Sequence, residues 1–227
     1  MLTVLVTGGL GFIGSHTCIS LLKKGHKIII LDSLINSSIS TLNKINQISK
    51  DFKSFHEESL IFKFGDLSNK DFIREKFIKS KKNNNPIQAV LHFAGLKSVS
   101  ESFTKTIDYW NTNVIGSINL VEVMRENGCK NIVFSSSATI FKPKLNELLN
   151  EDSEVGPINP YGNTKLVVEK FLNDVFQSDN KFWSVALLRY FNPVGAHSSG
   201  LLGENPKGLS NNLFPIILKV STGESER

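Results

Sequence analysis

The sequence predicts an α/β fold in which a doubly wound parallel sheet, of the Rossmann type, carries helices on both faces. An apolar run at residues 3–7 leads into a glycine-rich turn and then into a helical pattern. Four more short apolar runs, at 27–32, 60–64, 88–93 and 131–134, alternate with helical patterns. Each connection is long enough for the right-handed crossover that joins parallel strands. We therefore expect five parallel strands.

Composition limits the class of protein. The chain has 227 residues, 40% of them apolar, enough for one buried domain or for one domain and part of another. No run of eighteen apolar residues occurs and the chain enters a strand directly, so we expect neither a membrane span nor a secretion signal. Cys18 and Cys129 stand far apart, which indicates free thiols of a reducing compartment and a cytoplasmic location.

Charge and histidine spacing exclude two further kinds of partner. The net charge is +5, but the lysines are scattered without interleaved aromatic residues, so we expect no nucleic-acid partner. The 5 histidines show no metal-ligand spacing with each other or with the cysteines. We expect no metal.

The first turn has the spacing of a dinucleotide phosphate site. Gly8 suits the positive φ of a tight turn, Gly11 admits a pyrophosphate to the backbone, and Gly14 lets the helix pack closely. The second apolar run ends in Asp32, placed to accept hydrogen bonds from an adenosine ribose. Its carboxylate repels a 2′-phosphate, and residues 33–36 include no arginine, so we expect NAD rather than NADP.

The next elements follow in order. Helical patterns are expected at 15–24 and within the polar stretch 33–53, which should lie beside the adenosine. Asp66 follows the third strand and has two interpretations: its carboxylate accepts from the adenine amino group, or it caps the helix expected at 69–81. Ala94 and Gly95 after the fourth strand admit a ligand to the backbone, and Lys97 reaches a phosphate or ribose. One long helix is expected at 107–126.

A serine-rich strand end and a later helix carry the candidate chemistry. Tyr161 and Lys165 are four residues apart behind Pro160, so a helix places both on one face. A tyrosine that acts as a base at pH 7 needs a pKa about 3 units below its usual value near 10, and nearby positive charges supply such a fall. Ser137 would then bond the hydroxyl that Tyr161 deprotonates. The structural alternative is a half-buried tyrosine beside a solvated lysine.

Five stretches, at 6–17, 92–97, 134–139, 160–165 and 187–197, are similar to the extended short-chain dehydrogenase/reductase family, in its group of NAD-dependent epimerases and dehydratases. The resemblance covers nearly the whole chain. It implies a retained NAD that takes hydride from C4 of the hexose in UDP-galactose or UDP-glucose. The 4-keto sugar then turns and the hydride returns to its other face, so net redox is zero.

The resemblance also assigns residues to roles. Tyr161 accepts the hydroxyl proton, Ser137 orients it and Lys165 lowers the tyrosine pKa. With the three glycines and Asp32, the positions that would contact NAD are Phe12, Ile13, Ser33, Leu34, Ile35, Asn36, Ser37, Asp66, Leu67, Phe93, Ala94, Gly95, Leu96, Lys97, Thr112 and Phe191. The UDP-sugar would meet Ser137, Tyr161, Asn192, Asn212 and Leu213. The family also implies a homodimer through helices of the NAD domain.

Three departures from the family pattern affect this reading. Residues 140–142 read Ile-Phe-Lys, which places Lys142 near the site where the family has a glycine, and Thr112 stands where asparagine is usual. The family chain continues beyond residue 227, so we expect an NAD domain at 1–191 and only the start of a UDP-sugar domain at 192–227. The alternatives are a non-catalytic NAD-binding module and a 4,6-dehydratase; Ala138 and Thr139, where a dehydratase has acidic residues, argue against the latter.

Overall fold

The computed structural model describes residues 1–144, 148–204 and 212–224. Its centre is a parallel sheet of 6 strands in the order β3-β2-β1-β4-β5-β6. The strands are β1 (Thr3–Thr7), β2 (Lys27–Asp32), β3 (Leu60–Phe64), β4 (Ile87–His92), β5 (Asn131–Ser137) and β6 (Ser184–Tyr190). The strand order reverses between β1 and β4, the point at which open α/β sheets bind ligands.

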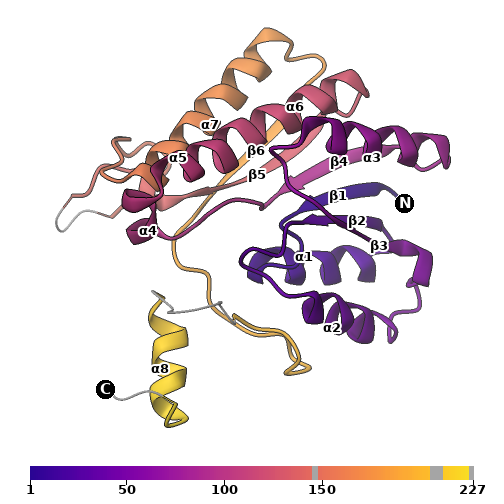
Figure 1. Cartoon of the computed structure of the whole chain (residues 1–227), viewed down its shortest axis with the longest axis horizontal. Coiled ribbons are helices and arrows are strands. Elements are labelled where there is room, and N and C mark those ends of the chain that lie inside the picture. The colour runs from indigo at the N-terminus through magenta and orange to yellow at the C-terminus, as the bar shows by residue number, and fades with distance from the viewer. Residues whose placement is uncertain (145–147, 205–211, 225–227) are drawn as a thin grey trace.

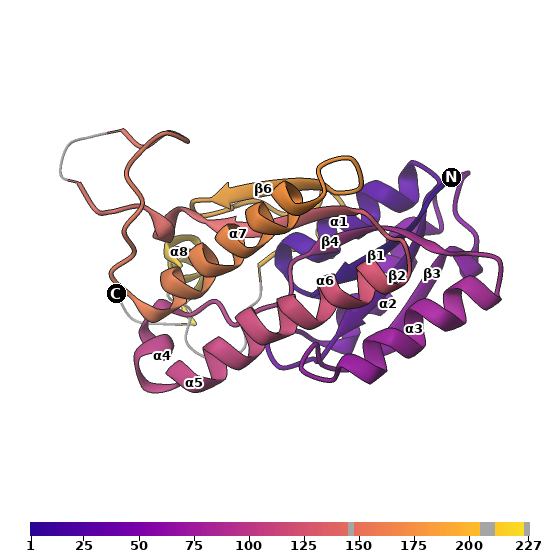
Figure 2. The ribbon, with the colours of Figure 1, turned by 90° about the horizontal axis from the view of Figure 1, so that it is seen from above.

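Helices cover both faces of this sheet. Figure 1 shows α1 (Phe12–Lys23) and α2 (Ile39–Ser49) on one face and α3 (Lys70–Lys82), α6 (Gly116–Glu126) and α7 (Pro160–Ser178) on the other. In Figure 2 these last three helices cross the sheet alongside one another. The shorter elements are α4 (Val99–Thr104), α5 (Thr106–Tyr109), η2 (Trp110–Ile115), α8 (Leu213–Ser221) and the 3₁₀ turns η1 (Glu57–Ser59) and η3 (Ala138–Ile140).

The doubly wound parallel class is confirmed, and two details of the prediction are wrong. A sixth strand, β6, pairs with β5 from Ser184 opposite Asn131 onward. It lies at the sheet edge and buries less than the inner strands, so its apolar signal is weak. The single helix expected at 107–126 is interrupted, because η2 is a π-helical turn between α5 and α6.

The side chains of the strands alternate between two hydrophobic cores, one on each face of the sheet. Leu5, Ile132 and Phe134 belong to the core beneath α3, α6 and α7. Val6 and Ile30 belong to the core beneath α1 and α2. Because side chains of a strand point alternately to the two faces, a run without polar residues fills both cores.

The two thiols and the C-terminal part complete the description. Cys18 and Cys129 are free and buried, as expected, and burial raises the pKa of Cys129 to about 12. Among the described residues, no helix is long and apolar enough to cross a membrane, and no cluster of His, Cys, Asp and Glu has the arrangement of a metal site. After β6 the chain returns to the α1 face, where Leu202 joins the core; α8 then stands apart from the sheet in Figure 1.

Candidate functional site

The turn between β1 and α1 has no room for a side chain at Gly8 or Gly14. Gly8 has φ +67°, and a Cβ there would lie 2.6 Å from the backbone nitrogen of Ala94. A Cβ on Gly14 would lie 2.8 Å from Gly9 Cα, so the helix packs directly on the turn. Gly11 precedes α1 and no side chain caps the helix, which leaves first-turn amides for an anion. The turn therefore fits a pyrophosphate.

Asp32 is held in place at the end of β2. Its Oδ2 accepts from the Leu10 amide at 3.0 Å, and its Oδ1 accepts from the Leu34 amide at 2.9 Å and from Ser37 Oγ at 2.7 Å. The side chain is buried beside the glycine turn. These contacts fix the carboxylate at the end of β2, the position that we expect to accept hydrogen bonds from an adenosine ribose.

A cavity of about 490 Å³ opens among the segments that follow β2, β3 and β4 and the turn η2. Its lining includes Ile35, Asn36, Asp66, Leu96 and Thr112, so five predicted cofactor residues from four segments meet at one place. Asp66 accepts from the Ser68 amide at 2.8 Å, and α3 begins four residues after it, at Lys70. Its alternative role as the cap of α3 is therefore wrong, because Asn69 supplies the capping oxygen, 2.9 Å from the Phe72 amide.

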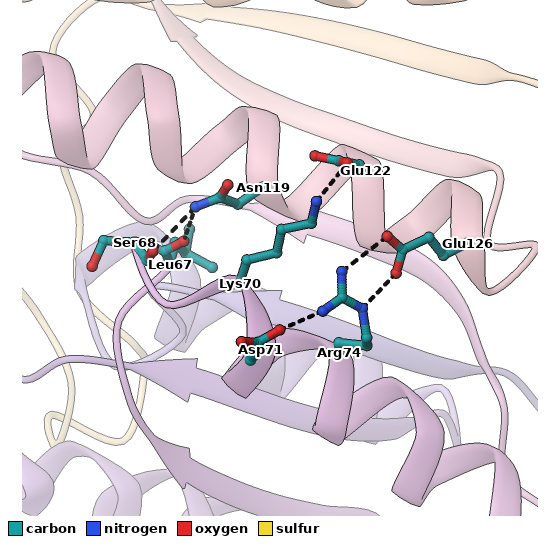
Figure 3. A network of polar contacts seen from close by, with 8 residues as sticks. All are labelled: Leu67, Ser68, Lys70, Asp71, Arg74, Asn119, Glu122 and Glu126. Atoms are coloured by element: carbon teal, nitrogen blue, oxygen red, sulfur yellow. Dashed lines mark hydrogen bonds and ion pairs between the residues drawn. The ribbon is translucent and has the colours of Figure 1, made fainter.

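A polar network between α3 and α6, drawn in Figure 3, supports the loop that carries Asp66. Asn119 Nδ2 donates to the carbonyls of Leu67 and Ser68, at 3.0 and 3.2 Å. Nearby, Arg74 joins the two helices through Glu126, with 2.8 and 3.0 Å between the guanidinium and the carboxylate. Sequence reasoning gave Asn119 no role, since its partners lie about fifty residues away.

The loop after β4 lies against η2 and α7. Gly95 has φ +156°, and a Cβ there would lie 2.9 Å from Asn113 Oδ1 and 3.7 Å from Lys165 Nζ. Asn113, in the π-helical turn, holds Leu96 on both sides: its Oδ1 accepts from the amide at 2.8 Å and its Nδ2 donates to the carbonyl at 3.1 Å. The π turn thus presents Asn113 to this loop while its neighbour Thr112 lines the cavity.

Two of the predicted site residues, Lys97 and Asn212, meet at one carboxylate, and the others after β6 lie on exposed surface. Lys97 Nζ lies 3.4 Å from Glu204 Oε1, and Asn212 Nδ2 donates to the same oxygen at 2.5 Å. A predicted cofactor residue and a predicted substrate residue therefore meet at one carboxylate that the sequence analysis did not single out. The remaining three lie on exposed surface after β6: Phe191, Asn192 and Leu213.

The serine, tyrosine and lysine of the candidate chemistry come together where β5 meets α7. Asn159 Oδ1 accepts from the Gly162 amide at 2.7 Å and starts α7. A Cβ on Gly162 would lie 2.6 Å from the carbonyl oxygen of Thr139, so the helix begins directly against η3. At this start of the helix, Tyr161 lies close enough to Ser137 for the serine side chain to act on the pKa of the phenol.

Lys165 is buried beneath this pair. Its Nζ donates to the Ser135 carbonyl at 2.8 Å and lies 4.8 Å from the centroid of the Phe134 ring and 5.9 Å from that of Tyr161. Burial lowers the pKa of Lys165 to about 8, and the charge of Glu169 opposes that fall. The solvated lysine of the structural alternative is thus not found.

The pKa of Tyr161 is raised, whereas the proposed proton acceptor needs a lowered pKa. Burial raises the pKa of Tyr161, and the hydrogen bond with Ser137 acts in the opposite sense but does not cancel it. Lys165 directs its hydrogen bond to Ser135 rather than to the phenol. A low tyrosine pKa therefore requires positive charge beyond the groups of the protein that lie here.

Two ion pairs hold the segment behind the site. Arg189 Nη2 lies 2.9 Å from Oε2 of the buried Glu169, and Arg189 Nη1 donates to the Glu151 carbonyl at 3.0 Å. Lys142, which the sequence analysis placed near the site, pairs with Glu154 at 2.9 Å across the backbone bridge between 141 and 155. Both partners of this second pair are about half exposed, so Lys142 is a surface residue of the loop.

Comparison with known proteins agrees with this geometry. The model of the NAD dependent epimerase/dehydratase family matches residues 4–226. UDP-glucose 4-epimerase of Bacillus subtilis (strain 168) is 45% identical over 226 residues, which are 100% of this chain and 63% of that protein. The enzyme of that name from Neisseria meningitidis serogroup C is 45% identical over 225 residues, 99% of this chain and 62% of its own length.

Solved structures give the same result. UDP-glucose 4-epimerase from Stenotrophomonas maltophila, with bound NAD and formylated UDP-arabinopyranose, has a TM-score of 0.89 and 40% identity over 99% of this chain and 63% of its own. The enzyme from Bifidobacterium longum, in complex with NAD+ and UDP, has a TM-score of 0.87 and 42% identity over the same shares. The chain spans about 63% of the length of such relatives. It belongs to the NAD dependent epimerase/dehydratase family.

Proposed function

We propose that this chain binds NAD and carries the catalytic centre of an isomerase that interconverts UDP-galactose and UDP-glucose at C4. The convergence of Ser137, Tyr161 and Lys165, in a chain whose first strand ends in a close-packed glycine turn, carries the proposal. The relatives described above are named UDP-glucose 4-epimerases, and both of the solved structures among them hold NAD.

The protein's own groups handle the proton. Bound NAD would supply the acceptor, and later the donor, of the hydride at C4. Tyr161 takes the proton of the 4-hydroxyl and later returns it to the oxygen of the 4-keto sugar, which gives the other epimer, and the Ser137 hydroxyl orients that oxygen. Buried Lys165 holds a positive charge behind the ring and stabilises the phenolate. Because the proton and the hydride both return to the sugar, the reaction has no net redox.

Asp32 favours NAD over NADP. Its carboxylate is fixed by three donors beside the glycine turn, so it cannot turn away from a 2′-phosphate without losing hydrogen bonds. The cavity lined by Asp66 and Leu96 would take the adenosine.

The substrate side is proposed to involve Asn192, Asn212 and Leu213. Exposed apolar side chains of α8, including Phe214, would belong to the start of a UDP-sugar domain at 192–227, after an NAD domain at 1–191. Since Asn212 and Lys97 share Glu204, sugar and cofactor contacts would be joined through one carboxylate.

The proposal is tested by incubating the chain with NAD and UDP-galactose and separating UDP-glucose by ion-exchange chromatography. We expect conversion, and a fall of about 10³-fold in its rate for Tyr161→Phe, because the proton acceptor is lost. NAD binding of that variant should not change. Tyr109→Phe is the matched control: it keeps the ring that packs edge-on against Tyr161, with 6.4 Å between the ring centroids, and removes only a hydroxyl that donates to the Ser98 carbonyl at 2.7 Å.

Three other outcomes would contradict this function. NAD binding without conversion would favour a non-catalytic NAD-binding module. A 4-keto-6-deoxy sugar as product would favour a dehydratase. Binding of NADP as tight as that of NAD would contradict the role of Asp32.

We also propose a homodimer and a reducing, cytoplasmic setting. Phe103, Ile107 and Trp110 lie on the three successive elements α4, α5 and η2, and their side chains are 60%, 77% and 38% exposed. Apolar side chains gathered in this way favour an interface. The free, buried thiols of Cys18 and Cys129 suit a compartment without disulfides.

A further inference from the structure

His92 is a buried histidine whose two ring nitrogens both have partners. It ends β4 and is 1% exposed. Its Nδ1 lies 2.7 Å from Thr7 Oγ1, and its Nε2 lies 2.8 Å from Ser117 Oγ. The two hydroxyls come from β1 and from α6, so the ring joins the central strand of the sheet to a helix that covers it.

The direction of each hydrogen bond in this network follows from the bond that Ser117 donates. Ser117 Oγ donates to the carbonyl of Asn113, which only accepts. Toward His92 the serine must therefore accept, so the proton of the imidazole is on Nε2. Burial, together with the charge of Lys165 on α7, lowers the pKa of His92 to about 3, so the ring is neutral at physiological pH. Its Nδ1 is then an acceptor, and the Thr7 hydroxyl donates to it.

Both ends of this hydrogen-bond network contact the loop at 93–97, which is predicted to bind the cofactor. Thr7 Oγ1 accepts from the Ala94 amide at 3.3 Å, where the Gly8 turn approaches most closely. At the other end, Asn113 holds Leu96 by its amide and its carbonyl. The network therefore holds the loop at 93–97 at two points, Ala94 and Leu96.

The same asparagine reaches the helix that bears the tyrosine. Asn113 Nδ2 donates to Thr164 Oγ1 at 3.0 Å, and Thr164 Oγ1 donates to the Tyr161 carbonyl at 2.7 Å. All five groups, from Thr7 to Thr164, are buried, so no water competes for these bonds.

We infer that His92, as the neutral Nε2–H tautomer, is a positioning residue that holds the loop at 93–97 in register with the helix of Tyr161. The inference rests on the proposed NAD site. A ring with the proton on Nδ1 would take from the Thr7 hydroxyl the acceptor of its proton, and would leave Ser117, whose own proton goes to the Asn113 carbonyl, without its donor. Only one tautomer satisfies all the groups.

The tautomer is tested on the full chain without added cofactor. In ¹⁵N-histidine-labelled protein, long-range ¹H–¹⁵N spectra should show a His92 ring protonated on Nε2 and unchanged from pH 6 to pH 8.5, and His92→Gln assigns the signal. A Nδ1–H ring, or a ring that titrates in this range, would overturn the inference.

The positioning role is tested by amide exchange and by NAD affinity. Ser117→Ala should speed exchange of the Leu96 amide at least about fivefold and raise the Kd for NAD roughly tenfold. Ser49→Ala is the matched control, a fully buried serine whose Oγ has no partner, and it should change neither. His92→Gln, which keeps a donor for Ser117, should bind NAD more tightly than His92→Leu.

The outcomes separate this inference from the proposed function. Ser117→Ala with exchange at Leu96 and NAD affinity like those of Ser49→Ala would overturn the positioning role. A native chain with the expected tautomer and exchange but no affinity for NAD would overturn the proposed function and leave the assignment of His92 intact.

Discussion

Lys165 is a cation in surroundings that penalise its charge. Its pKa of about 8 lies below the ordinary lysine value near 10.4, because the side chain is buried. Between these two pH values the unfolded chain binds more protons than the folded chain. The free energy of unfolding therefore rises with pH through this window, and the cost of burying the charge is greatest below pH 8.

This linkage gives a prediction that is independent of catalysis. Lys165→Met removes the titration and keeps an apolar stem. The free energy of unfolding of the native chain, minus that of Lys165→Met, should rise by about 2 kcal/mol from pH 8 to pH 10. Urea unfolding of both proteins at several pH values measures it. A difference that does not change with pH would show that the lysine is not held in the buried, charged form.

Burial also explains why Lys165 suits its proposed role. The Ser135 carbonyl and the Phe134 ring fix the ammonium close to the tyrosine, while Glu169, itself paired with Arg189, supports its charge. The cation is thus placed by groups that do not take part in proton transfer. A charge in a dry site acts more strongly on its neighbours than a solvated one.

At the scale of elements, the start of α7 depends on one close contact. Gly162 brings the helix against the Thr139 carbonyl, and we expect the same contact to hold Tyr161 at its distance from Ser137. The Asn159 cap alone would not fix that distance, because it acts within the first turn of α7.

Gly162→Ala should therefore move the helix start and impair the site. The added Cβ also lies 2.9 Å from Pro157 Cβ, so it meets atoms on two sides. We expect a loss of about 1–3 kcal/mol in the free energy of unfolding and a lower kcat for UDP-galactose. Gly203→Ala is the control, since its Cβ would make an ordinary 3.5 Å contact with Ala196 Cβ. Equal effects of the two substitutions would contradict the role of this contact.

The elements also show what the sequence does and does not encode locally. The glycine turn, Asp32 and the Tyr161–Lys165 pair follow from spacing over a few residues, and each is where the pattern places it. The π turn does not follow, because the apolar residues at 107–126 suit an uninterrupted helix. Within this turn, Asn113 accepts from the amide of Leu96, 17 residues away, a contact that no local pattern encodes.

For the whole molecule, the fold class is predictable and the edge of the sheet is not. Inner strands are buried on both faces and give clear apolar runs, whereas β6 is half-exposed and its residues give no clear strand pattern. The buried polar groups His92 and Glu169 form another class that sequence reasoning missed. Their roles depend on Ser117 and Arg189, residues brought near only by the complete fold.

The proposed homodimer gives a prediction at this scale. Ile107 is 77% exposed between Phe103 and Trp110. Ile107→Lys should weaken self-association at least tenfold, since a buried charge without a partner opposes an apolar interface. Sedimentation equilibrium measures it, with Ile78→Lys on α3, 41% exposed, as the control. A native chain that stays monomeric at high micromolar concentration would contradict the dimer.

The central claim is that one site removes a hydride from C4 of a UDP-hexose and returns it to the same carbon. The most direct measurement uses UDP-galactose that carries deuterium at C4, with NAD and the native chain, and analyses the product by mass spectrometry. The account predicts UDP-glucose that keeps the label, formed more slowly than from unlabelled sugar. Loss of the label to water, or no UDP-glucose at all, would contradict it.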